Sequence, residues 1–488
     1  AFFTFFSAVA LPGLAAGETV TFTYSANCLS PCPAARPYMP CAPPTTGAGV
    51  CTSAATEWVA VDTLVAGSGP NGTTFENRFN WHTFQFVVIQ ANSTTLKLAD
   101  ADLGGFVGKR ITNAQTKIGS FRSSSPKLNK VYEAFVQTYE GLTVSGMQVD
   151  CTNRERLGYG GDAHSRIEFA MDTYDSHALY SKWMVDWADT QAVGAIDDTE
   201  KPHVFGNVPN TAPTYSGAGS PMWGGITVLL PYELYRRYGD MRMLVTAYPT
   251  MKNWLEFMIH FSHNTDGLVH QAGFDWLGDW QAPHGCSDGN DPDLYNNAYI
   301  VYALRRAVEI VRAINDPAIA ADAAKFAAAA DSIGAAVHKA FYRASSSRYG
   351  PTSPPTAAAR QGHQVFPLVA GLTPKQSVPA VLAALVDELT NTSGVAKGHI
   401  DTGLTTTYLM GKLLSGGMEG LAGADSDRPD LIYSATMNPT WPSYSALIDA
   451  GLTTWPETWV SRGACITCLR THLTSPVHRR LATLLAEC

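Results

Sequence analysis

The hydrophobic pattern of this chain changes its period once, near residue 118, and this change constrains the fold more than any other feature. Before it, apolar residues alternate with polar ones, as at Val20 and Phe22, and Gly-, Pro- and Ser-rich segments separate the runs. From about residue 126 apolar residues recur at helical spacing, as at Leu128, Val131 and Phe135. Because strands and helices need different periods, we predict a strand region followed by a helical region.

The helical region contains roughly ten predicted helices joined by loops of very different lengths. One apolar repeat runs from Ile167 to Trp183, and two long helices are predicted from Asn297 to Ile314 and from Ala318 to Phe341. Asp316-Pro317 and Thr373-Pro374 each pair a capping residue with Pro at the first helical position. Paired helices in this number suggest an α/α barrel with a cleft at one end, and the absence of a short sequence repeat disfavours a solenoid.

The strand region, residues 1–118, is predicted to close as an antiparallel β-sandwich. Its first residues, Ala1 to Gly17, have the apolar core of a secretory signal and the small residues that precede its cleavage site. They lack an initiator Met and the basic residues that begin such a signal. We favour a strand, a turn at Pro12-Gly13 and a second strand from Thr19 to Tyr24. On this interpretation the domain is partial at its N-terminus, as in a fragment.

Composition excludes several classes of protein. Of the 488 residues 45% are hydrophobic and 16% are charged, which is typical of a globular chain rather than a disordered one. Lys and Arg total 34 against 42 Asp and Glu, so the net charge of −8 disfavours binding to nucleic acid. No apolar run is long enough to predict a membrane-spanning helix.

The chain has nine cysteines, and four of them cluster in a Pro-rich loop. These four are Cys28, Cys32, Cys41 and Cys51. Their wide spacing and the lack of a nearby His favour two local disulfides over a zinc site. Sequons at Asn71, Asn92 and Asn391 are compatible with an extracellular or secretory location, although the compartment and the oligomeric state stay undetermined.

The segment from Asp150 to Asp162 (DCTNRERLGYGGD) concentrates three carboxylates, two guanidinium groups and three glycines between two apolar helices. Such a charge density is hard to explain as packing. Glu155, between Arg154 and Arg156, offers a carboxyl group whose proton affinity its neighbours can tune for acid–base work. Asp162 directly precedes a predicted helix, so an ordinary N-cap role is the alternative for that residue.

Tryptophan recurs beside carboxylates and glycines in several other segments. They are Pro221-Met-Trp223-Gly, Phe274-Asp275-Trp276-Leu-Gly-Asp279-Trp280, Trp441-Pro-Ser-Tyr444 and Trp455-Pro-Glu457-Thr-Trp459. Indole faces pack on the C–H groups of sugars, and carboxylates accept hydrogen bonds from sugar hydroxyls, so this association favours a carbohydrate ligand. For any single Trp, burial in a core is the alternative.

The motifs of several other enzyme classes are missing. The sequence contains no H-E-x-x-H pair for a metal, no G-x-S-x-G elbow and no Gly-rich phosphate loop. The sequence therefore shows no motif for a helical metal pair, an α/β-hydrolase or a phosphate-binding cofactor loop.

Together these motifs resemble the α-L-rhamnosidases of glycoside hydrolase family 78. The segment 150–162 matches the signature D-C-x-x-R-E-R-L-G-[WY]-x-G-D throughout, and Trp223 and Asp279-Trp280 lie in segments similar to the family's P-A-W-G and G-D-W motifs. Further similar segments follow in family order. They are residues 79–86 near the N-terminus, 399–403, and 453–459, which resembles T-T-x-W-E-x-W.

The resemblance implies an inverting hydrolase that releases terminal α-L-rhamnose from glycosides or polysaccharides. It implies an (α/α)6-barrel-like catalytic domain over residues 119–488, with Glu155 as the general acid and Glu457 as the general base. Inversion requires the two carboxyl groups to lie about 6.5–9.5 Å apart, and we expect Glu155 in the less solvated environment. Residues implied in substrate binding are Asp150, Arg154, Tyr159, Asp162, Trp223, Asp279 and Trp280.

Three departures from the family pattern leave alternatives open. Pro456 replaces a Trp beside the implied base, and Gly225 replaces a residue that is often acidic. Residues 460–488 do not align with the family's later motifs, which suggests a catalytic domain that is incomplete at its C-terminus. The alternatives are a catalytically impaired carbohydrate-binding remnant and an α/α-barrel glycosidase of other specificity, such as one for fucose.

Overall fold

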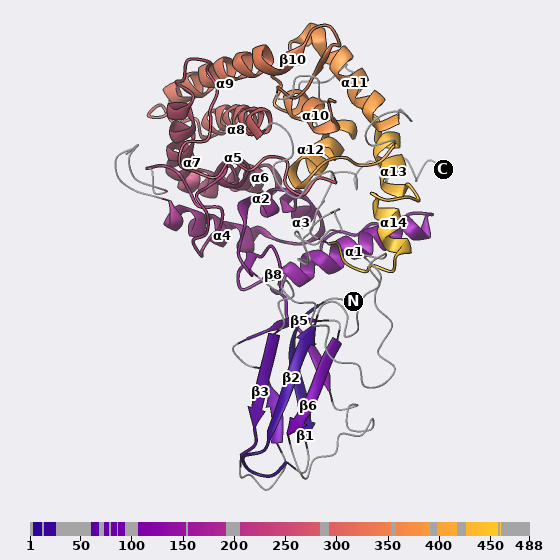
Figure 1. Cartoon of the computed structure of the whole chain (residues 1–488). Helices are drawn as coiled ribbons and strands as arrows, with labels where there is room; N and C mark the ends of the chain where they lie inside the picture. The colour runs from indigo at the N-terminus through magenta and orange to yellow at the C-terminus, as the bar shows by residue number, and fades with distance from the viewer. Residues whose placement is uncertain are drawn as a thin grey trace.

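The computed structural model describes residues 3–11, 14–25, 60–67, 73–77, 80–84, 86–92, 106–152, 155–191, 205–283, 292–352, 358–390, 398–416, 426–456 and 459. Figure 1 shows a ring of helices that adjoins a smaller region of strands. Strands end at Arg110 and long helices begin at Pro126, so the predicted boundary at residue 118 lies in the connection between them. The four clustered cysteines and the segment 460–488 lie outside the described residues.

The strand region is built from two antiparallel sheets. Its strands are β1 (Phe3–Leu11), β2 (Thr19–Ser25), β3 (Ala60–Val65), β4 (Thr73–Glu76), β5 (His82–Phe84), β6 (Phe86–Asn92) and β7 (Val107–Arg110). Strand β1 pairs with β4, β5 and β7, whereas β2 lies between β3 and β6. The strands predicted at the N-terminus and from Thr19 are confirmed.

One apolar core joins the two sheets. Val20, Phe22 and Tyr24 alternate along β2, and all three side chains are buried. The Phe22 ring stacks on Phe75 of the other sheet, with ring centroids 4.6 Å apart. Because successive side chains of a strand point to opposite faces, this alternation lets β2 bury one face against the second sheet.

The helical region contains the remaining elements. They are α1 (Pro126–Leu142), β8 (Thr143–Val144), β9 (Met147–Gln148), α2 (Gly160–His164), α3 (Ile167–Thr173), α4 (His177–Thr190), α5 (Pro221–Gly224), α6 (Ile226–Tyr238), α7 (Met241–Phe261), α8 (Pro292–Ile314), α9 (Ala320–Phe341), β10 (Tyr342–Arg343), β11 (Arg348–Tyr349), α10 (Gln361–Val369), η2 (Lys375–Ser377), α11 (Val378–Thr390), α12 (Leu404–Leu414), α13 (Pro429–Met437) and α14 (Tyr444–Asp449). None of these helices is long and apolar enough to cross a membrane.

The helices form an inner and an outer layer of the ring (Figure 1). Inner helices α3, α6, α8, α10 and α12 pack in this order, and α12 returns to α2 beside α3. Outer helix α9 buries Phe326, Ala330, Ile333 and Val337, which form one stripe at helical spacing. In α12, by contrast, every residue is buried. Helix α12, which includes the charged residue Lys412, therefore offers no face to solvent.

The two long helices predicted from Asn297 and Ala318 are confirmed as α8 and α9, with starts at Pro292 and Ala320. The apolar repeat from Ile167 to Trp183 instead spans two helices, α3 and α4. Tyr174 between them is extended, with φ −132° and ψ 151°. A hydrophobic repeat does not report such a break because both helices bury the same kind of side chain.

Aromatic residues close the ring between its first and last described helices. Phe135 of α1 contacts Tyr444 of α14 and Trp455, with ring centroids 5.6 and 5.3 Å away. The Trp455 backbone N–H also donates to the Thr138 hydroxyl of α1 at 3.0 Å. Trp459 packs on Tyr444 at 5.2 Å. Trp455 and Trp459 are both buried, so each has the core role that was the alternative for a single Trp.

An ionic cluster occupies the interior of the ring. Lys412 of α12 contacts Glu168 of α3 at 2.5 Å, and Arg237 of α6 contacts the other Glu168 oxygen at 3.0 Å. The Tyr408 hydroxyl also donates to Glu168. Burial opposes ionisation of Glu168, but the charges of Lys412 and Arg237 outweigh it and lower the pKa of Glu168 to about 2. The same buried setting, with Lys412 nearby, lowers the pKa of His164 to about 3.

Removal of Lys412 tests this cluster. We expect Lys412→Met to lower the free energy of unfolding by about 3–5 kcal/mol, because the buried Glu168 carboxylate loses one of its two cations. In the parent, Glu168 contributes stability above its ordinary pKa of 4.5 that is lost as pH falls towards 2, and this acid-induced loss shrinks in the variant. Urea unfolding between pH 7 and pH 3 measures both effects.

A matched control is Lys182→Met, which breaks the exposed Lys182–Asp186 pair of α4. Its cost is expected to stay below about 1 kcal/mol. Equal stability of the parent and Lys412→Met at pH 7 would contradict the role of the cluster.

Candidate active site

Helices α5 and α12 begin at the same end of the ring, where one loop segment contacts the first residues of both. Ser220, which caps α5, accepts a hydrogen bond from the Leu277 backbone N–H at 3.1 Å. The Gly403 N–H at the start of α12 donates to Asp279 Oδ2 at 2.8 Å. Segment 273–283 therefore holds the starts of two helices, and we call this end of the ring the loop end.

The predicted acid–base loop follows β9 at the loop end. Asp150 is fully buried, and its Oδ1 accepts from the Leu157 N–H at 3.0 Å. The Asp150 backbone N–H donates in turn to the Leu157 carbonyl at 2.9 Å. These bonds close the loop at its base and leave Glu155 in its outer part, where the side chain is accessible to solvent. Glu155 is thus more exposed than Asp150.

Arg156 holds this loop in an unusual conformation. Its φ of 59° lies in the left-handed region, which costs a non-glycine residue of order 1–3 kcal/mol. Its backbone N–H donates to the Cys151 carbonyl at 3.0 Å, and its Nε donates to the Thr152 carbonyl at 3.2 Å. Burial lowers the pKa of Arg156 from its ordinary value. The backbone and the side chain of Arg156 therefore both bind Cys151 and Thr152, which lie at the start of the loop.

Asp162 lies inside α2 and is not its N-cap, which corrects the alternative drawn from the sequence. The cap position is Tyr159. Arg166 forms an ion pair with Asp162 Oδ1 at 3.1 Å, and neither side chain is exposed. Arg166 also donates to the Val149 carbonyl at 2.9 Å. This buried arginine therefore connects the start of the acid–base loop to its end.

Two glycines allow Trp223 to approach α2. A Cβ atom added at Gly161 would lie 2.7 Å from the Trp223 ring, and one at Gly160 would lie 2.2 Å from the Trp223 carbonyl oxygen. Trp223 is 2% exposed and meets Trp280 edge to face, with ring centroids 6.1 Å apart. Trp280 is only partly buried. The indole pair connects segment 273–283 to the acid–base loop.

Asp275 and Asn210 fix the remaining loop at this end. The Asn210 side-chain amide donates to Asp275 Oδ2 at 2.6 Å, and the Ala218 N–H donates to the same oxygen at 2.9 Å. The Gly160 N–H donates to the Asn210 carbonyl at 2.9 Å. Segment 205–219 is therefore bound both to the start of α2 and to segment 273–283.

Asp150, Cys151 and Glu155 bring three potential ligand atoms within 4.8 Å of one another. Cys151 is disulfide-bonded. A disulfide sulfur is not the thiolate that binds metal ions. Among the described residues this cluster therefore offers two carboxylates, a weaker set than the three ligands its composition suggests.

The structure brings most of the predicted site residues to the loop end. Those described are Asp150, Glu155, Tyr159, Asp162, Trp223, Asp279 and Trp280. Arg154 and Glu457 lie outside the described residues, so the separation between the two implied catalytic carboxyl groups stays a prediction. Sequence reasoning missed Arg166, although its position four residues after Asp162 is the spacing of a helical ion pair. No sequence signal indicated the pairing of Asn210 with Asp275.

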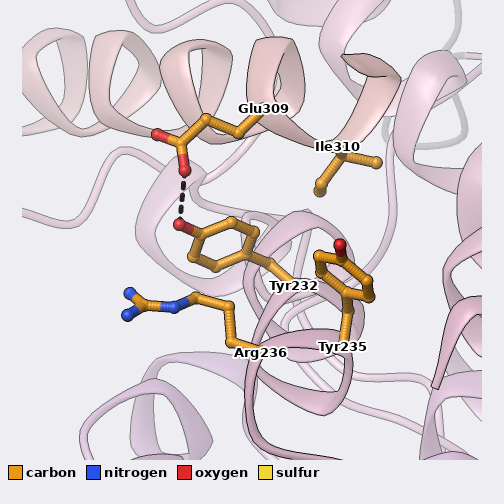
Figure 2. A pocket seen from close by; sticks show the side chains of 5 residues that line it. All are labelled: Tyr232, Tyr235, Arg236, Glu309 and Ile310. Carbon is orange, nitrogen blue, oxygen red and sulfur yellow. Dashed lines mark hydrogen bonds between the residues drawn. The ribbon is translucent and has the colours of Figure 1, made fainter. Parts of the chain in front are cut away.

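A separate pocket of about 210 Å³ lies between the later halves of α6 and α8, away from the loop end. Its lining residues are Tyr232, Tyr235, Arg236, Glu309 and Ile310. Figure 2 shows the Tyr232 hydroxyl directed at the Glu309 carboxylate, to which it donates at 2.5 Å. None of the predicted site residues lines this pocket.

Substitution of Gly161 tests the approach of Trp223. We expect Gly161→Ala to lower the free energy of unfolding by about 1–3 kcal/mol, because the new methyl group overlaps a buried indole. Gly141→Ala is the matched control, since a Cβ atom there meets nothing within 4 Å in helix α1. It should stabilise the chain by about 0.5–1 kcal/mol. Thermal unfolding of both variants gives the two signs, and a shift of the same sign would contradict the packing described here.

Comparison with known proteins places this geometry in a family. Residues 116–485 match the model of the bacterial alpha-L-rhamnosidase 6 hairpin glycosidase domain. The match includes most of residues 460–488, the segment that the family's motifs left unaligned. An alpha-L-rhamnosidase of Formosa agariphila is 27% identical over 402 residues, which are 80% of this chain and 38% of that protein. An alpha-L-rhamnosidase of Streptomyces avermitilis is 28% identical over 412 residues, 82% of this chain and 34% of that protein. The chain thus spans little more than a third of the length of these relatives.

Solved structures share the fold. The alpha-L-rhamnosidase from Dictyoglumus thermophilum superposes on this chain with a TM-score of 0.75 at 21% identity. The superposition covers 100% of this chain and 48% of that protein. The Streptomyces avermitilis alpha-L-rhamnosidase, solved in complex with L-rhamnose, superposes with a TM-score of 0.72 at 22% identity. The superposition covers 99% of this chain and 41% of that protein. The ring of paired helices, the loop end and the family match over residues 116–485 agree: this chain belongs to the bacterial alpha-L-rhamnosidase six-hairpin glycosidase family.

Proposed function

We propose that the chain is a glycoside hydrolase that releases terminal α-L-rhamnose from glycosides or polysaccharides, with inversion at the anomeric carbon. The observation that carries this proposal is the position of Glu155. It is a solvent-accessible carboxyl group in a loop held by buried Asp150 and Asp162, at the end of the ring where Trp280 is also partly exposed. The names of the curated relatives support the choice of sugar.

In this proposal Glu155 is the general acid that protonates the glycosidic oxygen, and Glu457 is the general base that activates water on the opposite face of the sugar. An inverting mechanism needs about 6.5–9.5 Å between the two carboxyl groups, enough for that water. Trp455 and Trp459, which flank Glu457 in the sequence, are buried against Tyr444. Two anchored neighbours are what a fixed catalytic base requires.

The remaining predicted residues would recognise the sugar. Asp150, Arg154, Tyr159, Asp162 and Asp279 are assigned to its hydroxyl groups. Trp280 is assigned to its apolar face, because it is the more exposed of the two indoles. Trp223, which meets the Trp280 ring edge to face, is assigned to the same face of the sugar. No step of this chemistry calls for a metal ion or an organic cofactor.

We also propose the finer architecture of the two regions. The two antiparallel sheets with their shared core correspond to a β-sandwich domain. The inner and outer layers of helices correspond to an (α/α)6 barrel with the substrate cleft at its loop end.

The variant Glu155→Gln tests the function. Loss of the acid should lower kcat for an aryl rhamnoside by about 10²–10⁴-fold without changing the midpoint of thermal unfolding. Glu133→Gln, at an exposed position on α1, is the matched control and should keep full activity. Proton NMR of the first product distinguishes inversion from retention, because inversion of an α-glycoside yields the β-sugar first.

Each result separates the alternatives. Full activity of Glu155→Gln removes this residue as the acid. Calorimetric binding of rhamnose with no turnover by the parent chain identifies a carbohydrate-binding protein instead of a hydrolase. Cleavage of an aryl fucoside in preference to the rhamnoside assigns another specificity.

A further inference from the structure

We propose that Arg156 is a positioning residue for the Glu155 carboxyl group, and that the strand region supplies the clamp that holds it. The proposal rests on the assignment of Glu155 as the general acid. It makes the strand region part of the catalytic apparatus rather than a neighbouring module. The clamp consists of Asn80 and Trp81, which directly precede β5, together with Thr83 within it.

The first part of the clamp is the Arg156 side chain. Its guanidinium carbon lies 4.3 Å from the centroid of the Trp81 ring, and its Nη1 donates to Asn80 Oδ1 at 2.7 Å. A guanidinium group that lies over an indole ring and also donates a hydrogen bond has two independent constraints on its position. Glu155 is the residue that immediately precedes this fixed side chain. The strand region therefore fixes the direction in which the Glu155 side chain projects from the loop.

The second part of the clamp lies two residues further along the strand. The Thr83 hydroxyl donates to the Thr152 hydroxyl. Trp81, directly before β5, and Thr83, within it, both face the loop, because Trp81 contacts Arg156 and Thr83 contacts Thr152. His82 between them faces the other way, where it stacks on Tyr24 at 4.3 Å and contacts Asp62 at 2.8 Å. The position of β5 in its sheet thus determines both contacts with the loop, that of Trp81 and that of Thr83.

The third part of the clamp joins Trp81 to the residues that lead into the loop. Trp81 packs on the apolar cluster of Leu142, Val144 and Val149, and Val149 directly precedes Asp150. The strand region therefore contacts the loop at its entry, at Thr152 and at Arg156. The left-handed backbone of Arg156 sits within these contacts, which explains how a residue without glycine's freedom keeps that conformation.

A displaced acid has a specific kinetic signature. A general acid must lie within hydrogen-bond reach of the leaving oxygen, and a displacement of about 1 Å lowers the rate by about 100-fold. The loss depends on the leaving group, because a good leaving group departs without a proton. A merely structural defect lowers the rate for all substrates alike.

The test is Arg156→Ala, assayed on phenyl rhamnoside and on dinitrophenyl rhamnoside. We expect kcat for the phenyl substrate to fall by about 100-fold with little change in KM, and kcat for the dinitrophenyl substrate to fall much less. Arg110→Ala is the matched control, since the Arg110–Glu140 pair at 2.5 Å also joins the strand region to α1 but does not contact the loop. This control should keep parental rates on both substrates.

Variants of Trp81 test the clamp from the other side. Trp81→Phe keeps an aromatic face and should retain most of the activity, whereas Trp81→Ala should resemble Arg156→Ala. The double variant Arg156→Ala with Trp81→Ala should lose no more than either single one, because both remove the same contact. Thermal unfolding of each variant identifies any loss that comes from global destabilisation.

The outcomes distinguish this inference from the function on which it rests. A parent chain that hydrolyses no aryl rhamnoside overturns both. An active parent whose Arg156→Ala variant behaves like Arg110→Ala overturns the clamp alone. Equal losses on the two substrates assign Arg156 a structural role and also overturn it. A loss that grows as the leaving group becomes poorer supports it.

Discussion

Helix α12 has no side that faces solvent, because every one of its residues is buried, and this constraint governs the interior of the ring. Its one charged residue, Lys412, therefore needs an opposite charge from another helix. Glu168 on α3 supplies that charge, and Arg237 on α6 contacts the other oxygen of the same carboxylate. These contacts fix the positions of the three helices relative to one another more specifically than apolar packing alone would. The loop end depends on that arrangement, because its loops begin and end on the same helices.

The acid–base loop shows how one short segment can give similar side chains different environments. Asp150 and Asp162 are fully buried and are held by a backbone N–H and by Arg166, respectively. Glu155 lies between them in the sequence and remains accessible to solvent. Asp150 and Asp162 thus hold the loop in shape from the interior, and Glu155 is the most exposed of the three carboxylates. This difference in environment could not be read from the order of the residues.

The sequence predicted those features of the fold that repeat at short range. The alternation along β2 and the apolar stripe of α9 are local patterns, and both elements were found where the pattern lies. The break at Tyr174 was missed because it changes the chain direction without changing the kind of residue that is buried. The signature at 150–162 indicated the candidate site through its composition. The partners of that segment, such as Trp81 for Arg156 and Asn210 for Asp275, join distant positions, and no local pattern encodes them.

The aromatic closure of the ring has a consequence for synthesis on the ribosome. Trp455 bonds to Thr138 across a separation of 317 residues, and Tyr444 covers Phe135 on the same helix. At about 5–20 residues per second, the apolar face of α1 waits about 15–60 s for the segment that covers it. During this interval the nascent chain exposes an aromatic surface that chaperones recognise and that invites aggregation. The contacts of Tyr444 and Trp455 with α1 thus end this exposure of its aromatic face.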